Sequence, residues 1–241
     1  MRLVLSFVIG FAFAAPTLAE PVAQFGFGIG LRACVGSPFD VSLSPGASIR
    51  VNLAMTGVNV PTRGYRASFE LLPQDGLAFP DAWRFDADGC QASAWRGTDY
   101  LPPPVETGCR SLAWQAIIGS AVTTCAFDPE TRKLRIDLAV EFTSAAAPDP
   151  RLAYLVGSVP FDHFASVVGT AGAPESCGGL ERAVCIHLLT LAIEDGDGNW
   201  IEAARPTSVL TVNAATLGGP AACAAVPARA ATWGAVRVLY R

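Results

Sequence analysis

The chain of 241 residues is poor in charge and has almost no lysine. Only 16% of its residues are charged, and Lys133 is the single lysine among 17 basic residues. The arginines form no cluster. Because proteins hold nucleic acids through several Lys or Arg contacts to phosphates, we expect no nucleic-acid partner. The 51% of hydrophobic residues instead allows the chain to bury a substantial core.

The sequence also lacks the short motifs of common catalytic sites. It has no GxSxG elbow, no HExxH helix and no glycine-rich phosphate loop. Its two histidines, His163 and His187, are the only candidates for the base of a Ser–His–Asp triad. His187 lies in an apolar segment, where a structural histidine is the preferred interpretation, and no nucleophile can be assigned to either ring. No pair of carboxylates is singled out as glycosidase-like. We therefore predict a non-enzymatic protein without a cofactor.

The first residues have the pattern of an export signal. Arg2 precedes the apolar run Leu3–Ala15, which is followed by small residues with a cleavage position after Ala19. An uncleaved anchor is the alternative, but it needs about 20 apolar residues. No later segment is long and apolar enough to cross a membrane. We predict a signal peptide over residues 1–19 and a secreted, extracellular or periplasmic protein.

Seven cysteines, an odd number, follow the predicted signal. In an exported protein cysteines are expected to form disulfides, and the odd count leaves at least one thiol. A bridge between Cys177 and Cys185 would close a short loop, and one between Cys90 and Cys109 would tie a Pro-rich segment. The sequence does not assign partners to Cys34, Cys125 and Cys223. A metal site is disfavoured because no CxxC pair is present.

Alternating apolar and polar residues dominate the rest of the chain. The cleanest case is LRIDLAVEF over residues 134–142, and SIRVNLAM and GYRASFELL repeat the pattern. CIHLLTLAI over residues 185–193 is apolar on both faces, as a central strand would be. Nine or ten such segments predict an all-β, two-sheet antiparallel sandwich of the jelly-roll type over residues 20–215.

The segment EDGDGNW at 194–200 has the composition of either a calcium loop or a tight turn. An EF-hand loop using Asp195, Asp197 and Asn199 would need an acidic residue at its twelfth position, which is Pro206. The flanking residues are also strand-like. Asp and Gly supply the turn conformations that a hairpin needs, so we predict a hairpin turn without metal. A calcium site of another type, with Glu194 and Glu202, is the remaining alternative.

The aromatic residues give the only candidate ligand site. Trp83, Trp95 and Tyr100 lie in the long segment between residues 77 and 104, where a sandwich would present a binding loop. The alternative is that these tryptophans cover the open end of the core. We favour core packing and keep Trp83, Trp95 and Tyr100 as the ligand-binding hypothesis.

Two stretches resemble known extracellular proteins. VSLSPGASIRVNLAMTGV and GYRASFELLPQDGLAF are similar to the first strands of cohesin-type sandwiches, with PQDGL at the position of their turn. CGGLERAVCIHLL and TWGAVRVLYR resemble exported bacterial proteins with Cys-rich loops and a Trp–Gly tail. The cohesin resemblance implies a sandwich that binds partners, and it transfers no binding residues.

The last 26 residues are expected to lie outside the sandwich. Residues 216–231 are linker-like. In residues 232–241, Thr232 is a possible N-cap and apolar residues follow it at helical spacing, so a short C-terminal helix is predicted. So short a helix must dock to persist. The helix would dock either on the chain's own sandwich or on a sorting partner, and the sequence does not decide between these two sites.

Two functions from different classes remain at this level. The preferred one is a secreted binding or adhesion module that recognises a protein or a glycan. The alternative is an extracellular polysaccharide or ester hydrolase with its site near the segment between Cys90 and Cys109. A groove with facing carboxylates lined by Trp83 or Trp95 would indicate the hydrolase, and a flat open sheet face would indicate the module.

Overall fold

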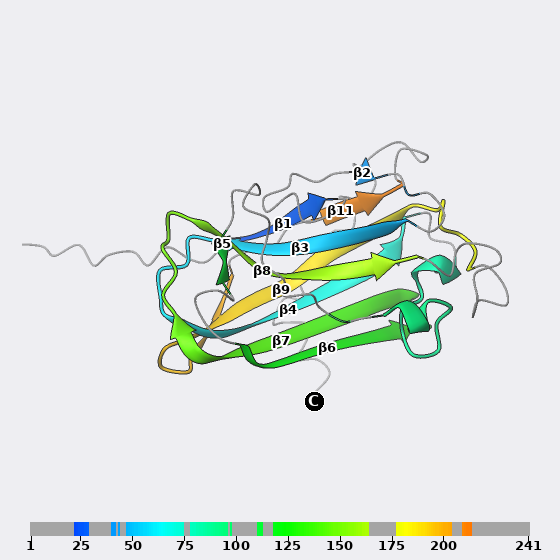
Figure 1. Cartoon of the computed structure of the whole chain (residues 1–241). Helices are drawn as coiled ribbons and strands as arrows, with labels where there is room; N and C mark the ends of the chain where they lie inside the picture. The colour runs from blue at the N-terminus through cyan, green and yellow to red at the C-terminus, as the bar shows by residue number, and fades with distance from the viewer. Residues whose placement is uncertain are drawn as a thin grey trace, which may run out of the picture.

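Two β-sheets packed face to face form the fold (Figure 1). The computed structural model describes residues 22–28, 40–41, 43, 47–74, 78–95, 97, 110–112, 118–163, 177–203 and 209–213. One sheet has the order β1-β3-β8-β5, and the other has the order β2-β11-β9-β4-β7-β6, with β10 paired to β9. The predicted all-β sandwich is confirmed.

The strands differ widely in length. Their bounds are β1 Val22–Gly28, β2 Asp40–Val41, β3 Ser48–Thr56, β4 Thr62–Pro73, β5 Arg110–Ser111, β6 Ile118–Asp128, β7 Lys133–Ala146, β8 Ala153–Asp162, β9 Val184–Asp195, β10 Trp200–Glu202 and β11 Val209–Val212. Two 3-10 turns, η1 at Asp81–Trp83 and η2 at Ala92–Ala94, follow β4. The pairs are antiparallel except β2–β11 and β5–β8, which are parallel.

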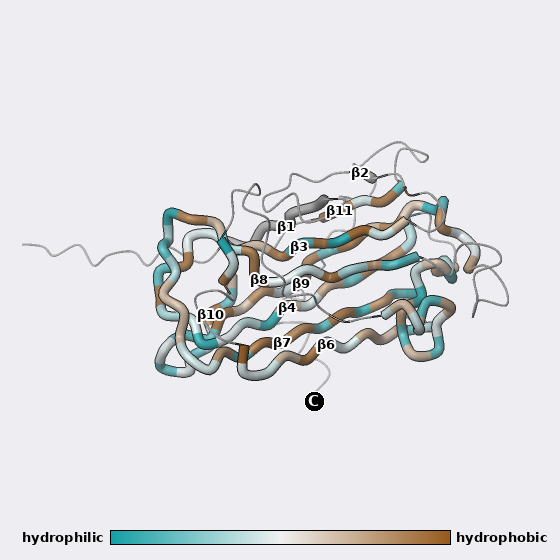
Figure 2. Tube along the Cα trace, viewed as in Figure 1, coloured by the Kyte–Doolittle hydropathy of each residue, from teal (hydrophilic) through white to brown (hydrophobic). Residues whose placement is uncertain are grey.

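The alternation read from the sequence decides which side of each strand is buried. On β7, Leu134, Ile136, Leu138, Val140 and Phe142 are all buried, whereas the residues between them reach water to differing extents. Hydrophobic and hydrophilic colours alternate along β7 in Figure 2. β4 repeats the pattern, and its register pairs buried positions with buried positions on β7 and β9. The segment predicted as a central strand is β9, between β11 and β4.

The two sheets share one hydrophobic core and are also joined by a hydrogen bond across it. The hydroxyl of Tyr65 on β4 donates to the carbonyl of Val156 on β8, and the Tyr65 side chain is fully buried. A buried phenol must find an acceptor, and here the acceptor belongs to the opposite sheet. This bond therefore fixes the position of one sheet relative to the other.

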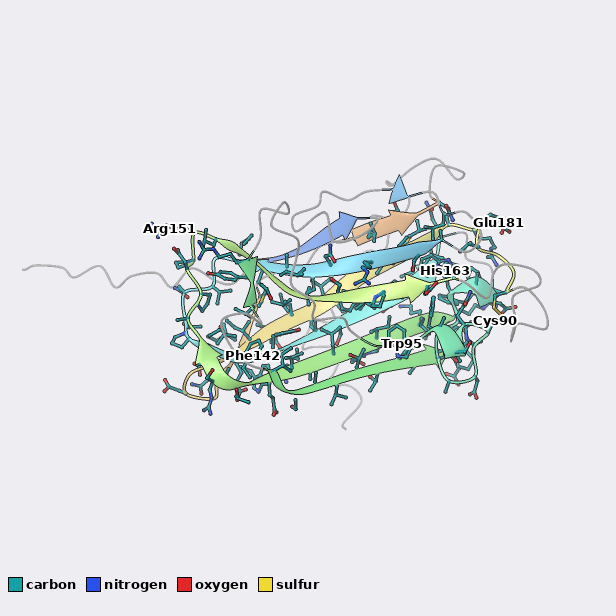
Figure 3. All side chains as sticks on the ribbon, viewed as in Figure 1. Cys90, Trp95, Phe142, Arg151, His163 and Glu181 are labelled. Atoms are coloured by element: carbon teal, nitrogen blue, oxygen red, sulfur yellow. A yellow bond between two sulfur atoms is a disulfide. The ribbon has the colours of Figure 1, made fainter. Side chains whose placement is uncertain are left out.

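Aromatic rings fill one end of the sandwich. Trp83, Phe85, Trp95, Phe161 and His163, here called the end cluster, pack with ring centroids 4.7–6.5 Å apart. Trp95 and His163 lie toward the same end of the molecule as Cys90, opposite to Arg151 (Figure 3). The segment with η1 and η2 thus folds over this end and covers the core there.

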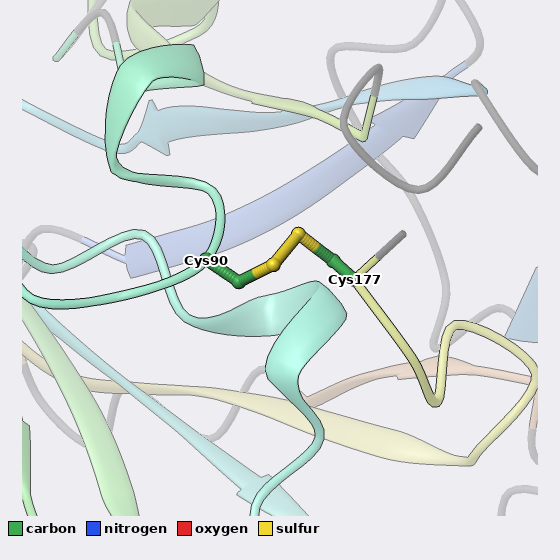
Figure 4. Close-up of a disulfide and its surroundings, with 2 residues drawn as sticks. All are labelled: Cys90 and Cys177. Carbon is green, nitrogen blue, oxygen red and sulfur yellow. A yellow bond between two sulfur atoms is a disulfide. The ribbon is translucent and has the colours of Figure 1, made fainter. Parts of the chain in front are cut away.

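The disulfide pairing differs from the prediction. Cys90 is bonded to Cys177, with Cα atoms 5.8 Å apart and a sequence separation of 87 (Figure 4). The predicted pairs Cys177–Cys185 and Cys90–Cys109 are both wrong. Cys185 is in a disulfide with a residue other than Cys177. Cys125 is the free cysteine of the described residues.

The predicted pairs fail because the fold brings together cysteines that are far apart in sequence. The η1 segment folds back against the loop before β9, where the amide of Ala82 donates to the carbonyl of Gly178 at 2.9 Å. This contact brings Cys90 within reach of Cys177. Cys185 instead lies within β9, paired with Leu72 and Thr211 of its neighbours.

Several predicted features lie outside the described residues. These are the signal peptide at 1–19, the linker at 216–231 and the tail at 232–241. In the described ranges, no helix has the length and apolar character that a membrane crossing requires.

The observed disulfide gives a stability prediction. A bridge over 87 residues removes much conformational freedom from the unfolded chain. Replacing both Cys90 and Cys177 by serine is therefore expected to lower the free energy of unfolding by roughly 2–4 kcal/mol. Chemical denaturation of this variant beside Cys125→Ser measures the effect, because the control loses a thiol without losing a bridge. Non-reducing peptide mapping that finds Cys90 joined to another cysteine would contradict the pairing.

Candidate functional site

The side of the seven-stranded sheet that faces away from the core is an open strand surface in the described part of the chain. It consists of the side chains of β9, β4, β7 and β6 that point away from the core, and we call it the outer face. The register sets these side chains in rows across the strands, such as Val122–Ala139–Arg66–Ala192 and Thr124–Asp137–Ser68–Thr190. Val122 is 58% exposed.

The corresponding side of the four-stranded sheet is closed. Asn52 lies between the core residues Val51 and Leu53 on β3 and so points away from the core, yet it is only 2% exposed. Its Oδ1 accepts a hydrogen bond of 2.6 Å from the hydroxyl of Ser158, which is also buried. A surface for a partner is therefore available on one sheet and not on this part of the other.

A shallow hollow of about 450 Å³ lies on the outer face. Short side chains line part of it, among them Ser68, Ala139, Thr190 and Ala192. Longer side chains, which include Arg66, Arg135, Asp137 and Glu202, line the rest. A strand position that faces water and carries only a methyl group leaves space between its longer neighbours. Ala139 is such a position, whereas Ala192 is 2% exposed and is covered by its longer neighbours.

Ion pairs hold several of the charged side chains on this face. The guanidinium Nε of Arg135 lies 2.9 and 3.0 Å from the two carboxylate oxygens of Asp137, whose Oδ1 also accepts a hydrogen bond from the Ser68 hydroxyl. Lys133 pairs with Glu70. These residues are neighbours on adjacent strands or on one strand, so the sheet itself sets their spacing. The ion pairs hold these side chains in place, which favours a surface that keeps its shape when a partner binds.

Arg66 has two contacts at the β10 side of the hollow. Its guanidinium carbon lies 4.5 Å from the ring centroid of Trp200, a distance at which the cation and the ring attract each other. One of its terminal nitrogens lies 3.9 Å from Oε1 of Glu202. Trp200 is 40% exposed. Arginine and tryptophan are enriched in the energetically important parts of protein interfaces, so this pair is a candidate contact point.

The predicted aromatic ligand site is not formed as the hypothesis required. Trp83 is fully buried in the end cluster and has no surface for a ligand, so its assignment is corrected to core packing. Trp95 is partly buried against Phe85 and Phe161, and its binding role stays a prediction. Tyr100 lies outside the described residues. The buried Trp83 agrees with the favoured interpretation, in which these rings cover the end of the core.

The described part of the proposed hydrolase region places one of its carboxylates in an ion pair. Asp86, a carboxylate in this segment, is bound by the guanidinium of Arg84 at 2.6 and 2.8 Å. Burial raises the pKa of Asp86, but the hydrogen bond and the charge of Arg84 outweigh this effect and lower it. A carboxylate held in this way suits a structural role. Residues 98–109 lie outside the described ranges.

The two histidines are structural in their surroundings. His163 is fully buried, with its Nδ1 3.2 Å from the carbonyl oxygen of Ala47. Within the described part of the chain, its Nε2 is buried without a hydrogen-bond partner. Burial lowers the pKa of His163 to about 4, against smaller opposing effects of the Ala47 carbonyl and Asp162. Burial also lowers the pKa of His187 on β9, which is paired with Glu70 on β4.

The segment EDGDGNW is a hairpin turn, as predicted. β9 ends at Asp195 and β10 begins at Trp200, with Glu194 paired to Trp200. The carboxylate of Asp195 accepts hydrogen bonds from the backbone amides of Asp197 and Asn199 at 2.9 and 2.8 Å. Gly198 has φ of +86°, a conformation that favours glycine. The carboxylate thus organises the turn, and the described residues contain no group of three or more His, Cys, Asp or Glu side chains suited to a metal.

Sequence reasoning did not find the hollow. The signal was present in LRIDLAVEF, where Ala139 occupies an outward position between Asp137 and Glu141. A small residue in a charged row marks a place where the surface is low. The second alanine, Ala192, comes from a strand 53 residues further along, and only the pairing through β4 brings the two together.

Comparisons with known proteins identify a similar fold. No protein-family model and no curated protein matches the chain. A cohesin module of a family 33 glycoside hydrolase from Clostridium perfringens is 14% identical, with a TM-score of 0.37 over 81% of this chain and 98% of its own. A type III cohesin module of a cell-surface anchoring scaffoldin from Ruminococcus flavefaciens is 8% identical, with a TM-score of 0.37 over 86% of this chain and 94% of its own.

A third similar structure is a type II cohesin domain from the cellulosome of Acetivibrio cellulolyticus. It is 10% identical, with a TM-score of 0.36 over 80% of this chain and 95% of its own. The weak resemblance to cohesin-type sandwiches predicted from the first strands is confirmed. At these identities the likeness concerns the fold alone.

The buried imidazole of His163 predicts a specific loss of stability in acid. Its folded pKa of about 4 lies below the ordinary histidine value of 6.5, so the unfolded chain binds the proton first as the pH falls. The stabilising contribution is complete above pH 6.5 and is lost as the pH falls from 6.5 to about 4. The loss should be of order 3 kcal/mol.

Urea denaturation across this pH range tests the assignment. His163→Gln carries no titrating group at this position, so its free energy of unfolding should depend less on pH between 6.5 and 4. His187→Gln is the comparison variant: it removes the second ring whose pKa burial lowers, so the two variants together separate the contributions of the two histidines. Equal pH profiles for wild type and His163→Gln would contradict the prediction.

The Asp195 turn gives a prediction about calcium. Asp195→Ala removes the acceptor of two backbone amides and should lower the melting temperature. Added calcium should leave the melting temperature of the wild type unchanged, because only a ligand of the folded state raises it. Asp197→Ala is the control, since it keeps the acceptor. A calcium-dependent rise that disappears in Asp195→Ala would show that the turn binds the ion.

Proposed function

We propose that the protein is a secreted, non-enzymatic binding module that recognises a protein partner through the outer face. The observation that carries the proposal is the open sheet surface of β9, β4, β7 and β6, with its hollow between Ala139 and Ala192. A flat strand surface with ordered charges and a local depression can accept a protruding side chain of a partner. Arg66 and Trp200 stand at the side of this depression as candidate contact residues.

The chemistry of the face supports a protein ligand over a glycan. Sugar recognition by stacking needs an aromatic ring with a free face. Trp83 is buried, and the guanidinium of Arg66 lies over the ring of Trp200. The hollow is lined by methyl groups, hydroxyls, carboxylates and guanidinium groups, which match the side chains and backbone of a protein.

The charge of the face indicates how the partner is recognised. The outward residues of β6, β7, β4, β9 and β10 include the acids Glu70, Asp128, Asp137, Glu141, Glu194 and Glu202 and the bases Arg66, Lys133 and Arg135. Six acids minus three bases leave a net charge of −3. A partner with a basic contact surface would complement it and gain in association rate at low salt.

An oxidising compartment suits the observed disulfide. Structural bridges such as Cys90–Cys177 persist in exported proteins and are rare in the cytosol. The predicted signal at residues 1–19 gives the same location by an independent route. The hydrolase alternative required facing carboxylates in a groove lined by Trp83 or Trp95. It receives less support, because Trp83 is buried and the carboxylate of Asp86 is held by Arg84.

Filling the hollow tests the proposal. Ala139→Trp places a large ring in an exposed position on the floor of the hollow and should reduce partner binding by about tenfold or more. Ala126→Trp is the matched control: this alanine is exposed and outward on the neighbouring strand, and it does not line the hollow. The readout is retention of proteins from the secreted fraction of the source organism, followed by titration of the retained protein.

The outcomes separate the two ligand classes. Loss of a retained protein with Ala139→Trp and its retention with Ala126→Trp support the outer face as the binding surface. Equal binding by both variants would contradict it. A glycan array probed with the wild type, Ala139→Trp and Ala126→Trp should be negative. A glycan signal that survives Ala139→Trp would favour the glycan alternative.

A further inference from the structure

Three large hydrophobic side chains of the described residues reach water, and all three lie at the hollow or next to it. They are Val122, Trp200 and Leu189, with exposed fractions of 58%, 40% and 37%. Val122 lines the hollow, and Trp200 packs against Arg66, which also lines it. Leu189 lies where the register between β9 and β4 shifts, and it precedes Thr190 of the hollow. Apolar groups that gather in one place on a surface indicate an interaction site.

Two carboxylates of the outer face have no ion-pair partner among the described residues, and they flank the same glycine. Glu141 on β7 and Glu194 on β9 are paired with Gly64 of β4 from its two sides. A Cβ atom at Gly64 would lie 3.3 Å from Oε2 of Glu194, so this carboxylate leans over the glycine. Other acids of the face are in ion pairs, namely Glu70–Lys133, Asp137–Arg135 and Glu202–Arg66. Uncompensated negative charge therefore lies on both sides of a position without a side chain.

The residues after Asn213, which lie outside the described ranges, have the opposite charge. They contain three arginines, Arg229, Arg237 and Arg241, and neither aspartate nor glutamate. The tail at 232–241 also carries the apolar residues Trp233, Val236, Val238, Leu239 and Tyr240. We propose that this tail docks on the outer face of its own chain, with its arginines toward Glu141 and Glu194 and its apolar side chains over the hollow. Complementary charge and apolar groups on both sides select this occupant.

The dimensions of the tail fit the face. In the helix predicted from the sequence, its ten residues would span about 15 Å. Val122 on β6 and Leu189 on β9 are three strand spacings apart, which is about 14 Å. Arg237 and Arg241 are one helical turn apart, and their long side chains can reach carboxylates on either side of one strand. A helix lying across β7 and β4 therefore meets the apolar groups and both acids.

The chain can reach this position from the end of β11. The side chain of Asn213 accepts a hydrogen bond from the amide of Leu43 at 2.8 Å and donates one to the carbonyl of Leu180 at 2.6 Å, so the segment leaves from a fixed point. β11 pairs with the first residues of β9, and the 12 residues of β9 cover roughly 40 Å. Residues 214–231 span roughly 60 Å when fully extended. A tether of this length raises the effective concentration of the tail at the face, so weak contacts suffice for docking.

Docking of the tail regulates the outer face, a consequence that rests on the proposed function. The tail and a basic partner compete for Glu141, Glu194 and the hollow. The partner then meets a free face only in the fraction of molecules whose tail is undocked, and its apparent affinity falls in proportion to that fraction. Docking itself requires no partner.

Photo-cross-linking in the disulfide-intact full chain, without a partner, tests the docking. Tyr240→benzoylphenylalanine carries the photo-reactive group, and mass spectrometry maps the products of irradiation at low protein concentration. Cross-links within one chain to β4, β7 and β9 are expected. Glu141→Arg and, separately, Glu194→Arg should lower their yield by about threefold or more. Glu130→Arg is the matched control, because this exposed glutamate lies in the turn between β6 and β7, outside the outer face.

An exchange of charges keeps the test valid if a single variant is less stable. Arg237→Glu should lower the yield alone and should restore it when combined with Glu141→Arg or with Glu194→Arg. The proposal is overturned if no cross-link reaches the outer face, if cross-links form only between two chains, if Glu130→Arg lowers the yield equally, or if neither exchange restores it. Cross-linking without a partner measures docking alone, so its failure is distinguishable from failure of the partner-binding test with Ala139→Trp.

Discussion

The register between β4 and its two neighbours is the constraint on which the rest of the structure depends. Side chains alternate between the faces of a sheet, so a slip of one residue would move Leu134, Ile136 and their neighbours into water and the charged rows into the core. The same register sets Ala139 beside Arg66 and Arg66 beside Ala192. Packing of the core therefore also fixes which side chains lie next to one another on the outer face. Exposed positions on this face can change their chemistry while the buried set keeps the strands in place.

The second constraint is the closure of the open end of the core. Trp83 packs edge-on against His163, with ring centroids 4.7 Å apart. Trp83 belongs to η1 and His163 follows the end of β8, so hydrogen bonds between strands do not by themselves hold the two rings in place. The bridge from Cys90 to Cys177 and the bond from Ala82 to Gly178 hold the covering segment in place. Burial of a titratable ring in this cluster stabilises the fold only while the ring is neutral. The end that closes the core is thus also the part that responds to acid.

Local patterns in the sequence were sufficient for the strands, since period-two alternation depends only on which face meets water. They were sufficient for the hairpin at Asp195 because turn residues act within a few positions. They failed for the disulfides, because Cys90 and Cys177 meet through a fold-back of η1 that leaves no local signal. For Trp83 the favoured interpretation, core packing, agrees with its burial, and the ligand-binding hypothesis does not. The hollow could not be predicted because its two alanines meet only through the pairing of three strands.

The turn that first suggested a calcium site has a structural connection to the outer face. The Asp195 carboxylate holds the amides of Asp197 and Asn199, and this closes the hairpin so that Trp200 pairs with Glu194. With that pairing in place, Glu202 lies opposite Ala192, and both Trp200 and Glu202 contact Arg66. Arg66 and Glu202 line the hollow. A carboxylate that organises a turn therefore also determines where the charged side of the hollow stands, without touching any residue that lines it.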